Sequence, residues 1–105
     1  MEKSLLIKFL GENPVFRIID SLIESKGIDV TKKQIIELSG ISKSAFFKYW
    51  KQIEEQEIVQ VTRKFGKTKL FILNSKNPIV KKLLELESIL IEKTLDKHKL
   101  IEIPA

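Results

Sequence analysis

Apolar residues recur at helical spacing in four stretches of the chain, and two of these stretches begin with the same signal. Asn13-Pro14 and Asn77-Pro78 each place a good N-cap residue before a proline, which fits the first turn of a helix. The first pair predicts a helix from Pro14 to about Ser25, with Gly27 after its end. The second pair predicts a helix from Pro78 to about Lys97.

Two shorter helices are expected between these. Thr31 and Gln34 have the spacing of a capping box, in which each side chain pairs with a backbone N–H of the other residue. This helix should end near Gly40. Ser42 is expected to cap the next helix, which would run to about Gln56.

Residues 58–73 alternate between apolar and polar positions and are rich in β-branched side chains, which is typical of strands. A turn at Gly66-Lys67 would join two strands into a hairpin. Residues 28–30 form a further short extended piece. The predicted fold class is therefore mostly α with a small β-hairpin, in the order helix, short strand, helix, helix, strand, strand, helix.

Half of the eight aromatic residues fall within five positions, 46–50. At about 100° per residue, Phe46, Tyr49 and Trp50 share one side of the helix with Ile53. Such a stripe favours a core over the alternative, stacking on single-stranded bases. Phe47 lies on the opposite side, among lysines.

Composition narrows the class of protein. The chain has 105 residues, 43% of them hydrophobic, which suits one cored domain. It has no cysteine and one histidine, His98, which we expect on the surface near a helix end. Disulfide scaffolds and Cys/His zinc sites are thereby excluded. No acid pair or glycine-rich phosphate loop is recognisable, so we expect no enzyme, no catalytic residue, no metal and no cofactor.

The location of the protein follows from its hydropathy. The first ten residues are too short and too interrupted by lysine for a signal peptide, and no apolar run approaches the roughly 20 residues of a membrane span. We expect a cytoplasmic protein without a membrane partner.

The net charge of +5 is concentrated in the middle of the chain. Residues 1–40 and 77–105 each carry equal numbers of basic and acidic side chains, whereas residues 41–76 carry eight basic and three acidic ones. The three acids, Glu54, Glu55 and Glu57, separate two basic islands. This distribution favours a polyanionic partner; the alternative is that the lysines only keep the surface solvated.

Two short helices joined by Gly40-Ile41-Ser42 and followed at once by a hairpin have the plan of a winged helix-turn-helix. The run TKKQIIELSGISKSAFFKYWKQIEEQEIV and the following VTRKFGKTKLFIL resemble winged-helix transcription regulators of the broad MarR and ArsR kind, especially short archaeal ones. The resemblance covers Asn13 to about Leu95. Glu57 stands where that family usually has glycine, so the helix before the hairpin should end without an easy left-handed cap.

This resemblance implies three parts: an N-terminal segment packing on a dimer (1–12), a winged helix-turn-helix DNA-binding domain (13–76), and a C-terminal dimerisation helix with a tail (77–105). It also implies that the helix after Ser42 enters the major groove, where its family members contact bases near the helix start. The residues expected to meet DNA are Lys43, Ser44, Ala45, Phe47, Lys48 and Lys51 in this recognition helix, Thr31, Lys32 and Lys33 in the preceding helix, and Arg63, Lys64, Lys67, Thr68 and Lys69 in the hairpin.

Side-chain chemistry refines these roles. Phe47 could contact a thymine methyl, or it could be partly buried against the hairpin. The basic hairpin would lie along or inside the minor groove. Arg63 is one of only two arginines, which limits bidentate reading of guanine and favours phosphate contacts and sites rich in A·T.

Apolar residues of the last helix spread over an arc of about 240°, more than one small domain covers. A second copy could bury the remainder, with Leu5, Leu6 and Ile7 contributing; the alternative is burial within one domain. The expected dimer interface is Ile79, Leu83, Leu86, Leu90 and Ile91.

Together these features predict a sequence-specific regulator of transcription, a repressor, that binds double-stranded DNA as a homodimer. The alternative is a winged-helix adaptor whose hairpin and aromatic helix bind an acidic protein. The target sequence and any small-molecule effector are not readable from the chain.

Overall fold

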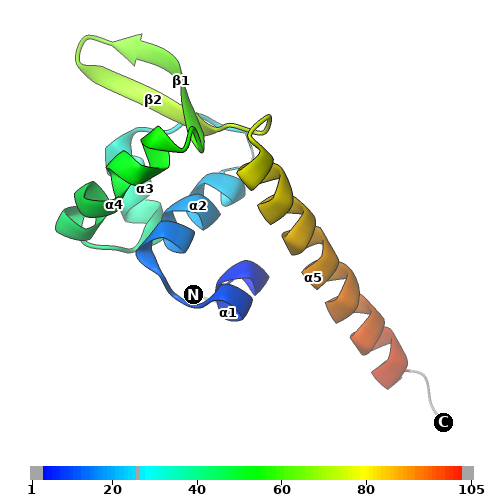
Figure 1. Ribbon diagram of the computed structural model, residues 1–105. Coiled ribbons are helices and arrows are strands. Elements are labelled where there is room, and N and C mark those ends of the chain that lie inside the picture. The colour runs from blue at the N-terminus through cyan, green and yellow to red at the C-terminus, as the bar shows by residue number, and fades with distance from the viewer. Residues whose placement is uncertain (1–3, 26, 103–105) are drawn as a thin grey trace.

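The computed structural model describes residues 4–25 and 27–102, with side chains up to residue 96. The side chain of His98 and the outermost residues of the predicted terminal segments, 1–3 and 103–105, lie outside this range. Figure 1 shows the arrangement of the described elements. They are α1 (Leu5–Leu10), α2 (Pro14–Glu24), α3 (Lys32–Ser39), α4 (Lys43–Glu55), β1 (Val59–Phe65), β2 (Thr68–Leu73) and α5 (Pro78–Glu102).

The predicted combination of several helices with one antiparallel hairpin is confirmed. The predicted caps are also present. Thr31 and Gln34 form both hydrogen bonds of the capping box, at 2.8 and 3.2 Å. Ser42 Oγ accepts from the backbone N–H of Ala45 at 3.1 Å, and Gly40 takes the left-handed conformation (φ 70°) that turns the chain from α3 into α4.

The aromatic stripe of α4 lies in the core, as its spacing predicts. Phe46, Trp50 and Ile53 are buried, and Tyr49 packs against the core at its edge. The Trp50 ring stacks on Phe46 at 4.9 Å and meets Phe71 of β2 edge-on at 5.0 Å. These contacts fix the hairpin against α4 and leave the opposite face of α4 outside.

The hairpin has two distinct faces because its strands pair in regular register on either side of a bulge at Thr62. One face carries Phe71 toward the core and ends in Lys64 and Lys69. The extended piece predicted at 28–30 contributes a single bridge, in which Val30 and Phe71 exchange backbone hydrogen bonds of 2.7 and 2.9 Å.

The end of α4 differs from expectation. Glu57 takes the left-handed conformation itself (φ 56°) although it is not glycine. Its carbonyl accepts from the side-chain amides of Asn74 (3.0 Å) and Asn77 (2.9 Å). The Asn77 amide also donates to the carbonyl of Gln56 at 2.7 Å. These bonds satisfy carbonyls that a helix end leaves free.

The N-terminal segment contains a helix that the sequence reading did not assign. Ser4 caps α1, whose residues Leu6 and Ile7 are buried where α1 packs against α2 and α5 (Figure 1). Contacts within one chain therefore cover part of the apolar surface that the sequence assigned to a dimer.

α5 is longer than predicted, since it continues to Glu102. Val80 is buried, and Leu83 and Leu84 pack on the core. Beyond them the helix extends away from the other elements (Figure 1), which gives the molecule a longest dimension of 62 Å. Of the expected interface, Leu83 faces its own core, Leu86 and Leu90 are half-buried, and Ile79 and Ile91 are exposed.

None of the helices in the described part of the chain combines the length and the apolar character that crossing a bilayer requires.

Candidate nucleic-acid interface

The outward face of α4 carries most of the side chains assigned to the recognition helix. Lys43, Ser44, Lys48 and Lys51 are exposed. Lys51 lies 3.9 Å from Glu55, and both side chains are largely in solvent, so this pair contributes little. Ala45 is half-buried. The face is thus polar and basic, and it points away from the aromatic core.

Phe47 interrupts this basic face. Its side chain is 48% exposed, and its ring meets the ring of Phe46 edge-on at 5.1 Å. The ammonium of Lys32 lies 5.9 Å from the centres of both Phe47 and Phe71. Lys32 therefore bridges the outward aromatic of α4 and the inward aromatic of β2, at a distance at which cation–π attraction operates.

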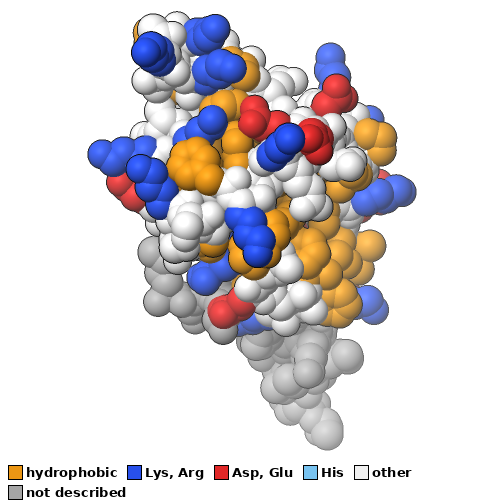
Figure 2. Space-filling model, turned by 60° about the vertical axis from the view of Figure 1, so that its left-hand side comes forward, with side chains coloured by type: hydrophobic (Ala, Val, Ile, Leu, Met, Phe, Trp, Pro, Cys, Tyr) orange, Lys and Arg blue, Asp and Glu red, His pale blue; other side chains and the backbone are white. Residues whose placement is uncertain are grey.

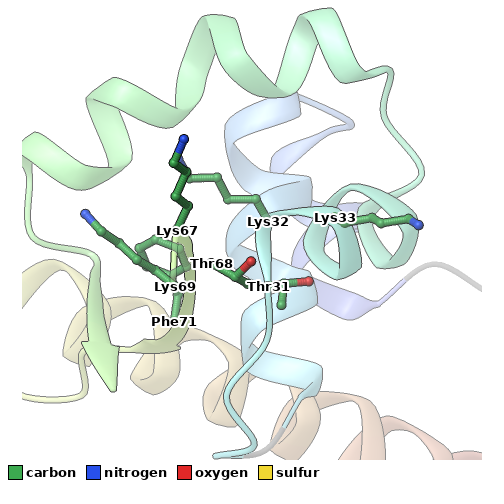
Figure 3. Close-up of a pocket in the computed structure, with 7 residues that line it drawn as sticks. All are labelled: Thr31, Lys32, Lys33, Lys67, Thr68, Lys69 and Phe71. Atoms are coloured by element: carbon green, nitrogen blue, oxygen red, sulfur yellow. The ribbon is translucent and has the colours of Figure 1, made fainter. Parts of the chain in front are cut away.

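A groove opens between the start of α3 and the hairpin. Its volume is about 580 Å³. Figure 3 shows the side chains of Lys32, Lys67 and Lys69 directed to the side where α4 lies, whereas Lys33 points the other way. The residues lining the groove are Thr31, Lys32, Lys33, Lys67, Thr68, Lys69 and Phe71. No carboxylate lines it, so its charge within the described structure is uniformly positive.

The hairpin adds a further basic surface. Lys64 and Lys69 pair directly across the two strands, an arrangement that costs free energy because like charges face each other. On the lobe at the top of Figure 2, Lys and Arg side chains gather without acidic ones. A bound polyanion would relieve this repulsion.

Arg63 has a different environment from the lysines. Its Nε and Nη2 donate to Oδ2 and Oδ1 of Asp29 at 2.8 and 2.9 Å, and Thr62 Oγ1 donates to Asp29 Oδ2. Hydrogen bonds from Arg63 and Thr62 lower the pKa of Asp29 to about 2, and the bond to Asp29 raises the pKa of Arg63. The guanidinium is thus engaged by a carboxylate, although the sequence assigned it to DNA.

The structure brings together lysines of α3 and of the hairpin, which are separate in the sequence, while Arg63 stands apart. Two further residues at the hairpin escaped sequence reasoning. Asp29 gives no pattern signal, because its partner Arg63 lies 34 residues away. Phe65 fits the alternating pattern of a strand, and its position beside Gly66 in a basic turn is the signal that sets it apart.

This geometry can hold a rigid, extended polyanion. The basic outward face of α4 can lie in a groove of the polyanion, and the cations of α3 and the hairpin can contact its charged backbone. Among the described residues, no group of three or more His, Asp or Glu side chains could hold a metal ion. Comparison with protein families, with curated proteins and with solved structures finds no match for this chain.

Proposed function

We propose that this chain is a winged helix-turn-helix protein that binds double-stranded DNA in a sequence-specific manner and regulates transcription, as a repressor. In this proposal α3 and α4 are the helix-turn-helix and the β1–β2 hairpin is the wing. One observation carries it: Lys32 of α3 and Lys67 and Lys69 of the hairpin line one groove and are directed to the side where α4 lies, and none of the described residues that line this groove is a carboxylate.

The proposed docking follows from dimensions. The major groove is about 12 Å wide and accepts one α-helix. The outward face of the N-terminal half of α4 carries Lys43, Ser44 and Lys48, which are short or basic, and the apolar Phe47. Placed in the groove, this half brings Ser44 and Phe47 to base edges.

Lysines would then hold the DNA backbone on either side of the major groove. With α4 in the major groove, Lys32 at the start of α3 and Lys64, Lys67 and Lys69 of the wing lie toward phosphates. A helix start also favours phosphate through its dipole. These contacts supply affinity, whereas Ser44 and Phe47 supply sequence preference.

A homodimer is part of the proposal. The exposed Ile79, Ile89, Ile91 and Leu95 lie along α5, and pairing of two such helices would bury them and place two recognition helices on one duplex. A twofold arrangement of this kind predicts a palindromic site.

The proposal is tested by selecting bound sequences from a pool of random duplexes and comparing variants on the enriched site. Ser44→Ala or Phe47→Ala should weaken binding there by roughly 1–3 kcal/mol and leave binding to unrelated duplexes nearly unchanged. The triple variant Lys64→Ala, Lys67→Ala and Lys69→Ala should weaken binding to all duplexes alike. Circular dichroism of each variant checks folding, because Phe47 also touches Phe46.

An adaptor for an acidic protein is the competing function. It predicts that selection enriches no sequence and that the triple variant loses an acidic protein ligand while duplex affinity is unaltered.

A further inference from the structure

Phe65 is a large aromatic side chain whose position burial does not explain. It ends β1, immediately before the Gly66-Lys67 turn, and is 62% exposed. Its cross-strand neighbour is Thr68, which is too small to cover the ring. The ring therefore stands at the tip of the hairpin, and the hairpin projects from the helices (Figure 1).

The ring is nevertheless supported from one side. Arg63, two residues earlier on the same face of the strand, has its guanidinium carbon 5.6 Å from the centre of the Phe65 ring. That guanidinium is itself held by the two hydrogen bonds to Asp29. A chain of contacts from Asp29 through Arg63 to Phe65 thus orients an exposed ring. Among the described residues of the hairpin tip, Arg63 is the cation that a carboxylate neutralises.

The lysines around the ring indicate what it meets. Lys64 and Lys67 flank Phe65 and Gly66 in sequence, and Lys69 lies across from Lys64. Lys64 and Lys69 lie on the opposite face of the hairpin, the face of Phe71, so the tip carries cations on one face and the apolar ring on the other. Such a tip suits a surface with two rows of phosphates and apolar material between them. The minor groove of a duplex has that composition, and apolar side chains that enter it wedge between base pairs and kink the helix.

We infer that Phe65 is a wedge that enters the minor groove of bound DNA and partly unstacks one base step, and that Asp29 and Arg63 are positioning residues for it. This inference rests on the proposed function. It assigns sequence preference to the hairpin as well as to α4, because pyrimidine–purine steps such as TA unstack most easily.

The test uses A·T-rich duplexes that carry 2-aminopurine at successive positions, together with the same duplex labelled at its two ends for energy transfer. On binding the unaltered protein, fluorescence should rise at one step, and the ends should approach as expected for a kink of about 20–90°. Phe65→Ala should abolish both signals and weaken binding roughly tenfold. Phe65→Leu should keep most of both, since leucine is also an effective wedge.

Phe9→Ala is the matched control, because Phe9 is the same residue type, is 65% exposed and lies on α1, which is away from the hairpin (Figure 1). It should change neither signal. Should Phe65→Ala unfold by circular dichroism, Phe65→Thr replaces it, since threonine suits a strand end.

Asp29→Asn separates positioning from folding. It removes a negative charge, so duplex affinity should stay or increase, whereas the 2-aminopurine signal should fall; a merely unfolded wing would lower both. The inference is overturned if the unaltered protein binds duplex with the expected salt dependence but Phe65→Ala retains the full kink. If the unaltered protein fails to bind duplex at all, the proposed function fails instead.

Discussion

At the scale of single residues, Glu57 shows how the junction between α4 and the hairpin is held. A left-handed conformation costs a non-glycine residue roughly 1–2 kcal/mol. The bonds from Asn74 and Asn77 to its carbonyl maintain this conformation. The conformation is therefore set by the surroundings of Glu57 and not by the preference of the residue.

Glu57→Gly should for this reason raise the free energy of unfolding by about 0.5–1 kcal/mol, because the relief of strain exceeds the entropy that glycine loses on folding. Urea denaturation followed by circular dichroism measures the change. Gly40→Ala is the control of opposite sign: Gly40 has φ 70°, and a Cβ there would meet only Arg17 Nη2, at an ordinary contact distance of 3.9 Å, so the backbone conformation alone should make alanine destabilising by about 1 kcal/mol. If Glu57→Gly instead lowers the free energy of unfolding, the left-handed conformation of Glu57 is not strained.

Asp29 makes stability depend on pH. Its pKa is about 2 in the folded protein against an ordinary 3.8. A lowered pKa means that the ionised carboxylate stabilises the fold above the ordinary value and that this contribution is lost as the pH falls from about 4 to about 2.

Asp29→Asn should accordingly lower the free energy of unfolding at pH 6, and the difference from the unaltered protein should shrink toward zero near pH 2. Urea titrations at several pH values follow this difference. A difference that stays constant down to pH 2 would show that Asp29 is not held by Arg63 in solution.

At the scale of elements, Asn77 connects three segments. Its Oδ1 accepts from the backbone N–H of Ile79 at 2.7 Å and caps α5, while its Nδ2 donates to the carbonyls of Gln56 and Glu57. The side chain is buried. Its backbone N–H donates to the carbonyl of Asn74, directly after β2, at 3.0 Å. One residue thus couples the end of α4, the end of the hairpin and the start of α5.

Asn77→Ala should lower the free energy of unfolding by about 2 kcal/mol, since it removes the cap of α5 and the part-buried bond to the Gln56 carbonyl, while the Glu57 carbonyl keeps its bond from Asn74. Asn13→Ala is the matched comparison. Asn13 caps α2 with one bond of 2.9 Å to Val15 and is exposed, so its loss should cost only about 1 kcal/mol. Equal costs for the two variants would contradict the coupling role.

Most elements could be predicted because their signals are local. The caps at Asn13, Thr31, Ser42 and Asn77, and the stripe of aromatics on α4, depend on residues within one or two helical turns. α1 has only six residues, too few for a periodic pattern. The pairing of Asp29 with Arg63 joins distant segments, so only the fold reveals that a carboxylate engages Arg63.

At the scale of the whole molecule, α5 extends away from the domain with isoleucine and leucine side chains exposed. If two copies pair through it, light scattering at micromolar concentration should give twice the chain mass of 12.2 kDa. Ile89→Lys together with Ile91→Lys should yield a monomer that keeps its helicity, because neither side chain is buried. A light-scattering mass of one chain for the unaltered protein would contradict the proposed dimer.

The central claim is that the basic surface of α3, α4 and the hairpin binds the phosphates of a duplex. Its most direct test is the affinity for a fluorescent duplex, by anisotropy, as a function of salt concentration. If about four lysines neutralise phosphates, log Kd should rise with log salt at a slope of about 3.6, a loss of about a hundredfold between about 50 and 200 mM. An affinity that does not change over this range, or no binding at the lowest salt, would contradict the account.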